Sequence, residues 1–170
     1  MRMAIHTVAV IGAGTMGAGI AQICAQAGWE TRLHDAFPEG LEAGMERIDA
    51  FWEKGIARGK TTSEQKSEWA GNLRAVSDMA EAVHNVDLVI EAVPEILDLK
   101  QRIFAELDVL APPTAVLGTN TSGLRISEIA SATNRPDRVV GMHFFNPVPI
   151  MKLLELVRHD KISDATIEAA

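Results

Sequence analysis

The glycine pattern near the amino terminus is the feature that most restricts the fold. The segment VAVIGAGTMGAGIA places Gly12, Gly14 and Gly17 in G-x-G-x-x-G spacing, after a short apolar run and before a helical pattern over 15–27. In this spacing the first glycine permits a tight turn, the second admits a pyrophosphate close to the backbone, and the third lets the helix pack against the strand. Free N–H groups and the positive dipole end at the helix start attract phosphates. The pattern therefore predicts a strand–turn–helix unit that binds a dinucleotide.

Asp35 ends the second expected strand, at about the 20-residue distance that is typical of such units. Its carboxylate is suited to accept hydrogen bonds from the adenosine ribose hydroxyls and would repel a 2′-phosphate, so NAD is predicted rather than NADP. Arg32 and His34 precede it and alternate with it in direction. Thr15 and Met16, which open the helix, are further candidate cofactor contacts. The glycines alone would also suit an FAD site or a turn without a ligand.

Short β-branched runs alternate with helical patterns along the chain. Strands are expected at residues 6–12, 30–35, 73–77, 86–92, 114–120 and 138–144. Helices are expected at 15–27, 38–59, 63–70, 78–84, 95–110 and 124–131, with a further helix starting after Ser163. Apolar strands separated by helices indicate an α/β fold: a Rossmann-like, doubly wound, mostly parallel sheet with ligands at the carboxyl ends of the strands. The run KLLELV is expected to add an antiparallel edge strand.

A helical hairpin is expected over about residues 38–70, inserted between the second and third strands. Its first helix carries one apolar stripe, formed by Leu41, Met45, Ile48, Trp52 and Ile56. Thr62 and Gln65 form a capping box at the start of the second helix. The pattern leaves open whether the hairpin projects from the sheet or serves as extra cover for the core.

The composition argues against several classes of protein. The 170 residues carry a formal net charge of −7 and no block of Lys or Arg, which argues against nucleic acid or an anionic membrane as a partner. No apolar run approaches the ~20 residues of a membrane span, and no signal-peptide cleavage site follows the amino terminus. The single cysteine, Cys24, excludes an internal disulfide. We expect a buried core thiol there, no metal site, and a cytoplasmic protein.

The segment GMHFFNPVPIMKLLELV, residues 141–157, places His143 and Glu155 in apolar surroundings. Because a buried charge is costly unless it is paired, each is expected to have a partner. Their separation suits two antiparallel segments joined by the NPVP turn, whose prolines fix φ. The residues alone leave open whether His143 is catalytic or a hydrogen-bonded core histidine.

Four motifs in order, GAGTMGAGIA, VIEAVPE, GTNTSGL and HFFNPVPIMKLLELV, give the chain a family resemblance over essentially its whole length. It resembles the L-3-hydroxyacyl-CoA dehydrogenases, and the short-chain 3-hydroxybutyryl-CoA dehydrogenases most of all. The resemblance implies reversible, NAD-dependent oxidation of L-3-hydroxyacyl-CoA to 3-ketoacyl-CoA, as in fatty-acid and butanoyl-CoA metabolism. Two alternatives are a dehydrogenase of the same framework that acts on a non-CoA hydroxy acid, and a non-catalytic NAD-binding module.

The resemblance also implies roles for particular residues. His143 would be the general base toward the 3-hydroxyl, or the acid in reverse, and Glu155 would hold its other ring nitrogen. Ser122 would hydrogen-bond the reacting oxygen, and Asn146 would lie near the nicotinamide and the substrate. The family's cofactor contacts match Ala92, Glu95, Lys100, Asn120 and Ser122.

Plainer roles stay open for three of these residues. Ser122 also suits the N-cap of a helix in LRISEIA, Glu95 suits a first helical turn, and Lys100 suits a solvated surface. In the family the projecting hairpin receives coenzyme A. Its candidate phosphate contacts here are Lys54, Arg58, Lys60 and Lys66, each with a solvated face as the alternative.

The domain organisation expected from the resemblance is an NAD-binding domain over residues 1–160. Residues 161–170 would begin an all-helical domain, the rest of which is absent from this chain. In the full-length parent that domain would form the interface of a homodimer.

Overall fold

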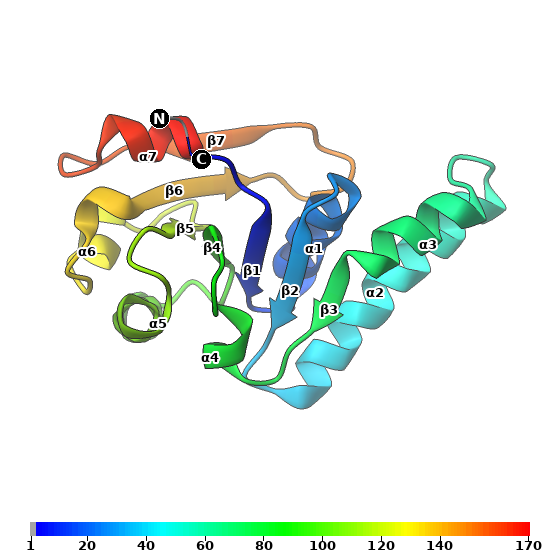
Figure 1. Ribbon diagram of the computed structural model, residues 1–170, viewed down its shortest axis with the longest axis horizontal. Helices are drawn as coiled ribbons and strands as arrows, with labels where there is room; N and C mark the ends of the chain where they lie inside the picture. Colours follow the sequence, from blue (N-terminus) through cyan, green and yellow to red (C-terminus); the bar gives the residue numbers. More distant parts are fainter. Residues whose placement is uncertain (1–2) are drawn as a thin grey trace.

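The chain folds into one seven-stranded sheet with helices on both faces (Figure 1). The computed structural model describes residues 3–170. The strands are β1 (Thr7–Ile11), β2 (Glu30–His34), β3 (Leu73–Ala75), β4 (Leu88–Glu91), β5 (Val116–Thr119), β6 (Val139–Phe144) and β7 (Leu154–Val157). Their order is β3-β2-β1-β4-β5-β6-β7; all neighbours are parallel except β6 and β7, which are antiparallel. This confirms the doubly wound sheet and the antiparallel edge strand.

The helices follow the expected order, with shorter bounds in places. They are α1 (Thr15–Gln26), α2 (Pro38–Ala57), α3 (Ser63–Gly71), α4 (Met79–Ala82), α5 (Leu97–Leu110), α6 (Ile126–Ala130) and α7 (Asp164–Ala169), with a 3-10 turn at Pro136–Arg138. Helix α5 starts later than expected, because a turn closed by the Ile96 N–H and the Pro94 carbonyl precedes it. None of the helices in residues 3–170 is long and apolar enough to cross a membrane.

The two faces of the sheet bury two separate apolar clusters, because successive strand side chains point to opposite faces. On β1, Val8 and Val10 pack with α1 and α2, whereas Ala9 and Ile11 pack with the α5 and α6 side chains. Cys24 of α1 lies in the first cluster, and burial raises the pKa of its thiol to about 12. This confirms the buried core thiol.

The helical hairpin α2–α3 both covers the core and projects from it. Its base is close to the glycine turn, since a Cβ on Gly44 of α2 would lie 2.6 Å from the Ala13 carbonyl oxygen. Farther out, Trp52 and Trp69 bring the two helices together, with ring centroids 5.8 Å apart. The far end extends beyond the sheet (Figure 1). The Thr62–Gln65 capping box is present as expected.

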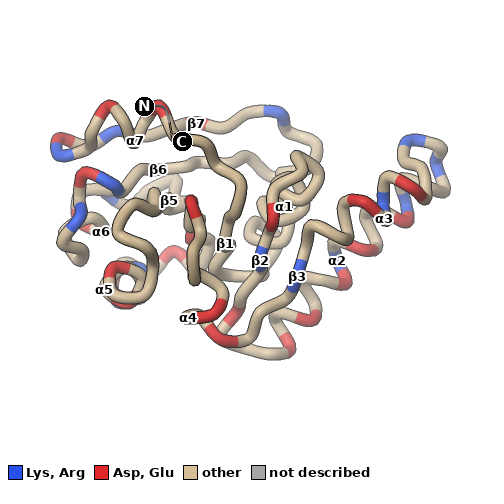
Figure 2. The backbone as a smooth tube through the Cα atoms, in the orientation of Figure 1, with Lys and Arg blue, Asp and Glu red and all other residues tan. Residues whose placement is uncertain are grey.

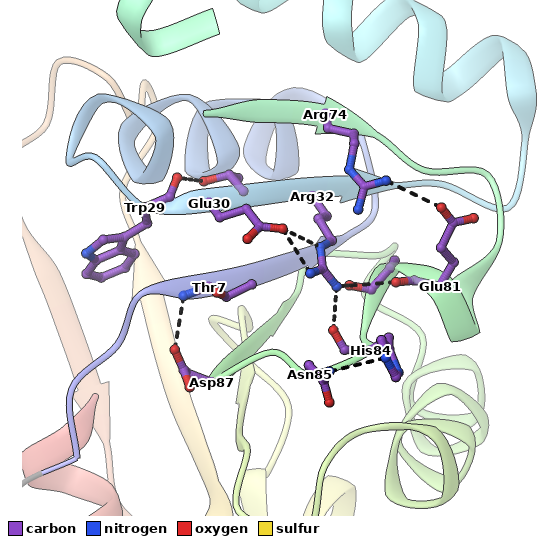
Figure 3. Close-up of polar contacts among 11 residues, drawn as sticks. Thr7, Trp29, Glu30, Arg32, Arg74, Glu81, His84, Asn85 and Asp87 are labelled. Atoms are coloured by element: carbon purple, nitrogen blue, oxygen red, sulfur yellow. Dashed lines mark hydrogen bonds and ion pairs between the residues drawn. The ribbon is translucent and has the colours of Figure 1, made fainter. Parts of the chain in front are cut away.

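The Arg32 side chain of β2 binds the end of α4 and does not point toward the cofactor side of the strand. Its guanidinium pairs with Glu30 at 2.9 Å and donates to the main-chain carbonyls of Glu81, Ala82 and His84 (Figure 3). Carbonyls at the end of a short helix lack part of their helical hydrogen bonds, and the buried cation donates to them here; the Glu81 carbonyl also accepts the His84 N–H at 3.3 Å.

Candidate cofactor and catalytic site

The glycine turn joins β1 to α1, and two of its three glycines are required for steric reasons. Gly12 has φ +105°, and a Cβ there would lie 2.7 Å from the carbonyl oxygen of Ala92. A Cβ on Gly17 would lie 1.7 Å from the carbonyl oxygen of Gly12. A Cβ on Gly14 would meet nothing within 4 Å, so the backbone is open to a ligand at this position. Gly12 and Gly17 therefore shape the turn, and Gly14 presents its backbone outward.

Asp35 links the end of β2 to this turn. One carboxylate oxygen accepts the Ala13 N–H at 2.8 Å and the other accepts the Phe37 N–H at 2.9 Å. Each oxygen keeps a further lone pair, so the carboxylate remains able to accept ribose hydroxyls. Its orientation is therefore fixed by the protein itself.

A cavity of about 610 Å³ lies over the turn, between Asp35 and α5. Six of the expected cofactor contacts line it: Gly12, Gly14, Thr15, Met16, Asp35 and Ala92. His34 lines it as well, although strand alternation predicted that it would point elsewhere; its Nδ1 lies 2.9 Å from the Val76 carbonyl oxygen. Sequence reasoning missed the apolar wall made by Phe37, Met79, Leu99 and Ile103. The apolar stripe of α5 was the available signal.

Of the other expected cofactor contacts, Gly17 lies in α1, and the remaining four lie beside the ends of β4 and β5: Glu95, Lys100, Asn120 and Ser122. Glu95 accepts a hydrogen bond from the Thr121 hydroxyl and another, at 3.3 Å, from the Ser122 N–H. The side chain of Ser122 is exposed. The N-cap alternative for Ser122 is wrong, because α6 starts at Ile126 with Arg125 in the cap position.

Lys100 is not a solvated lysine, as its plainer alternative supposed. Its side chain is 0% exposed and its ammonium group lies 2.8 Å from Glu91 Oε2 and 2.9 Å from the carbonyl oxygen of Asn120. The Asn120 side chain in turn accepts the Phe144 N–H at 3.1 Å. Glu95 does not lie in the first turn of α5 either, since the helix begins at Leu97.

His143 and Glu155 face each other across β6 and β7. They are direct cross-strand partners, and Nδ1 of the ring lies 3.6 Å from Oε1 of the carboxylate. The expectation of a buried pair is wrong: the His143 side chain is 24% exposed and that of Glu155 is 60% exposed. The reason is position, because β7 is the edge strand and Glu155 has no further strand beside it.

The NPVP turn between these strands reaches back to α1 and α2. Val148 is buried against α1, where a Cβ on Gly19 would lie 2.9 Å from its Cβ. Asn146 is exposed and lines a cavity of about 120 Å³ shared with Thr15 of α1 and Phe51 of α2. Asn146 therefore lies between α1 and the α2 helix of the hairpin.

The basic residues of the hairpin fall into two groups. Lys66 is paired with Asp49 at 2.7 Å and with Glu53, so it is already neutralised. Lys54, Arg58 and Lys60 are exposed. Blue segments at the outer tip of the hairpin in Figure 2 mark the turn that carries Arg58 and Lys60. Within residues 3–170, no group of three or more His, Cys, Asp or Glu side chains is arranged to hold a metal ion.

Comparison with known proteins identifies the family of this domain. Residues 7–170 match the model of the 3-hydroxyacyl-CoA dehydrogenase NAD-binding domain. The chain belongs to this family. The expected fold and the NAD cofactor class are thereby confirmed.

Relatives of known name show how much of each protein the domain represents. The chain is 44% identical over 164 residues to a probable 3-hydroxybutyryl-CoA dehydrogenase of Bacillus subtilis, covering 96% of this chain and 57% of that protein. The crystal structure of FadB2 from M. tuberculosis superposes with a TM-score of 0.95 at 41% identity, over 98% of this chain and 59% of the other. The crystal structure of 3-hydroxybutyryl-CoA dehydrogenase from Escherichia coli superposes with a TM-score of 0.94 at 41% identity, over 98% of this chain and 35% of the other. The 3-hydroxyacyl-CoA dehydrogenase domain thus spans about half, or less, of each of these relatives.

Proposed function

We propose that this domain binds NAD and supplies the acid–base pair for oxidation of L-3-hydroxyacyl-CoA to 3-ketoacyl-CoA, a reversible reaction. The observation that carries the proposal is the register of β6 and β7, which sets His143 opposite Glu155. Because β1, β4, β5 and β6 are parallel, their carboxyl ends share one edge of the sheet. The glycine turn, Ser122 and the end of β6 therefore lie along the same edge, where ligands of doubly wound sheets bind.

The cofactor fits the residues present. The open backbone at Gly14 and the start of α1 would meet the pyrophosphate, and the fixed carboxylate of Asp35 would accept the ribose hydroxyls. When bound, NAD supplies the acceptor for the hydride removed from C3 of the substrate. Glu95, Asn120 and Asn146 remain proposed contacts of its nicotinamide half.

His143 is proposed to take the proton of the 3-hydroxyl, because imidazole changes charge between about pH 5 and 8 and so serves as base and acid. Glu155, whose Oε1 lies 3.6 Å from Nδ1 of the ring, would orient the ring and support the positive charge that develops on it. Ser122, exposed at the end of β5, would hydrogen-bond the same substrate oxygen. The proton thus leaves toward His143 while the hydroxyl oxygen is held by Ser122.

Coenzyme A is proposed to lie along the hairpin. Lys54, Arg58 and Lys60 are exposed, and within residues 3–170 none of the three forms an ion pair, unlike Lys66. Phosphates of coenzyme A would be attracted to these cations. We also propose a cytoplasmic protein that acts as a homodimer when the domain is part of a longer chain.

Two measurements test the proposed function. Calorimetric titration of the purified chain should show NAD binding and much weaker NADP binding. NADH oxidation should then be followed with acetoacetyl-CoA and with free acetoacetate, using the chain continued by the carboxyl-terminal part of its Bacillus subtilis relative. Equal rates with both substrates would favour a non-CoA hydroxy-acid dehydrogenase, and NAD binding without any turnover would favour a non-catalytic module.

A further inference from the structure

His34 is a buried ring that lines the proposed cofactor cavity, and the proposed function gives it no role. It is the last residue of β2 and lies opposite Ile11 of β1 in the strand register. Both residues line the cavity, on the sheet face that packs with α5. His34 is only 4% exposed. Because a buried polar atom is costly without a hydrogen bond, each ring nitrogen needs a partner.

One ring nitrogen is held by the protein. Nδ1 lies 2.9 Å from the carbonyl oxygen of Val76, the residue that follows β3. A carbonyl oxygen can only accept a hydrogen bond, so Nδ1 carries the proton and donates it. In the neutral ring Nε2 then has a lone pair and can only accept. The Val76 carbonyl therefore determines the tautomer of His34 and leaves an acceptor on the other nitrogen.

The other ring nitrogen, Nε2, has no hydrogen-bond partner within residues 3–170. No fully buried side-chain nitrogen or oxygen in this range lacks a partner, so Nε2 keeps a small accessible surface. Because His34 is otherwise buried and lines the cavity over the glycine turn, this surface opens into that cavity. A nearly buried acceptor without a partner thus faces the space proposed for the cofactor.

The lining of the cavity indicates which part of the cofactor supplies the donor. The apolar side chains of Phe37, Leu99 and Ile103 suit the faces of a flat aromatic base. Asp35 accepts the Ala13 N–H and is proposed to accept the ribose hydroxyls, so the base attached to that ribose would lie among these apolar side chains. The exocyclic amino group of adenine is a hydrogen-bond donor at the edge of such a base.

We propose that His34 recognises the adenine base of the cofactor, by accepting a hydrogen bond from its exocyclic amino group at Nε2. His34 then determines specificity for an adenine dinucleotide over a dinucleotide whose base lacks this amino group. The inference rests on the proposed NAD site and adds the base that this site selects. The ribose and the pyrophosphate are recognised separately, at Asp35 and at the open backbone of Gly14.

The test compares two dinucleotides by calorimetric titration of the purified chain at about pH 8, where imidazole is largely neutral. NAD carries the amino group, and in nicotinamide hypoxanthine dinucleotide a carbonyl oxygen replaces it. His34→Asn keeps an amide near the position of Nδ1, which can still donate to Val76, and has no group at the position of Nε2. His34→Gln places an amide near the position of Nε2. His6→Asn, at an exposed histidine just before β1, is the matched control.

The unsubstituted chain and His6→Asn should bind NAD about two- to tenfold more tightly than the hypoxanthine dinucleotide, the range expected for one neutral hydrogen bond. His34→Asn should lose this preference, because its affinity for NAD falls to that for the hypoxanthine dinucleotide. His34→Gln should keep part of the preference, since its amide oxygen can accept. NMR of the ring nitrogens needs no variant: NAD should shift the His34 Nε2 resonance more than the hypoxanthine dinucleotide does.

Two results would overturn the proposal while the proposed NAD site stands. One is equal affinity of the unsubstituted chain for the two dinucleotides, and the other is a preference that survives in His34→Asn. If His34→Asn does not fold, an Nε2 resonance that responds equally to both dinucleotides overturns it instead. Absence of binding by both dinucleotides is a different outcome, which would overturn the proposed NAD site and the inference with it.

Discussion

Asp35 is oriented by two main-chain N–H groups before any cofactor arrives, at Ala13 and Phe37. Asp35→Ala should therefore weaken NAD binding by about 1–3 kcal/mol, the value of a charge-assisted hydrogen bond, and should also remove the repulsion of a 2′-phosphate. Calorimetric titration with NAD and NADP measures both effects, with exposed Asp160→Ala as a control. An unchanged ratio of the two affinities would mean that Asp35 does not meet the ribose.

The His143–Glu155 pair is open to solvent on its glutamate side, so its two members should differ in importance. In the extended enzyme, His143→Gln should lower kcat by at least ~10²-fold with little change in NAD affinity, as expected for loss of a general base. Glu155→Gln should lower kcat by at least about tenfold, because an amide can hold the wrong tautomer and cannot support an imidazolium. Steady-state rates of acetoacetyl-CoA reduction measure both. A near-normal kcat for Glu155→Gln would reduce Glu155 to a strand-pairing residue.

At the scale of elements, the carboxyl end of α5 is held by one charged contact that should make stability depend on pH. Burial alone would raise the pKa of Asp108, but hydrogen bonds from the Asn134 N–H and from Arg135 outweigh it and hold the pKa below its ordinary value of 3.8. Arg135 also donates to the main-chain carbonyls of Asp108 and Ala111. A carboxylate whose pKa is depressed by folding stabilises the protein above its ordinary pKa and loses this effect as pH falls through the folded value.

Asp108→Asn should thus reduce the free energy of unfolding near neutral pH. The difference from the unsubstituted chain should shrink as the pH is lowered from neutral to below 3.8, because Asp108 itself becomes protonated as the pH falls through its lowered pKa. Urea unfolding at a series of pH values measures it. A difference that stays constant over this range would show that the pairing charge contributes nothing to stability.

The elements themselves were largely predictable from the sequence, because strand and helix periods are local properties. The apolar stripe of α2 gave the buried residues Leu41, Ile48 and Trp52 correctly, and the capping box fixed the start of α3. The environments of Lys100 and Glu155 were not predictable in this way. A buried lysine and an exposed glutamate are decided by which strand end or sheet edge lies beside them, and only the folded arrangement determines that.

At the scale of the whole molecule, the proposed reaction site has one open side. Glu155 is 60% exposed, and the chain covers 57% of the Bacillus subtilis relative and 59% of the FadB2 chain. The purified chain should therefore bind NAD but reduce acetoacetyl-CoA at least tenfold more slowly than the extended enzyme, because good positioning of reactants lowers a barrier by roughly 7–11 kcal/mol. Parallel assays of both proteins at equal concentration measure this. Rates within tenfold of each other would show that one domain completes the site.

The cofactor half of the site could be read from the sequence and the catalytic half only with the family resemblance. The glycine spacing and the position of Asp35 are short sequence patterns that determine the local geometry, and six of the predicted contacts line the cavity. The pairing of His143 with Glu155 depends on a strand register that no local pattern specifies. The hydrogen bonds that connect Glu91 through Lys100 and Asn120 to Phe144 depend on contacts among three strand ends, and no sequence pattern predicted them.

The antiparallel return of β7 has a consequence for how this domain tolerates changes in chain length. Side chains alternate between the faces of a strand, so insertion or deletion of one residue within β7 would turn Glu155 to the opposite side of the sheet and leave another side chain opposite His143. At the exposed tip of the hairpin, around Gly59, an added or removed residue would not reverse the side on which a strand residue lies. Among relatives, insertions and deletions should therefore be more frequent at the hairpin tip. The edge strand should keep its number of residues even where individual residues are substituted.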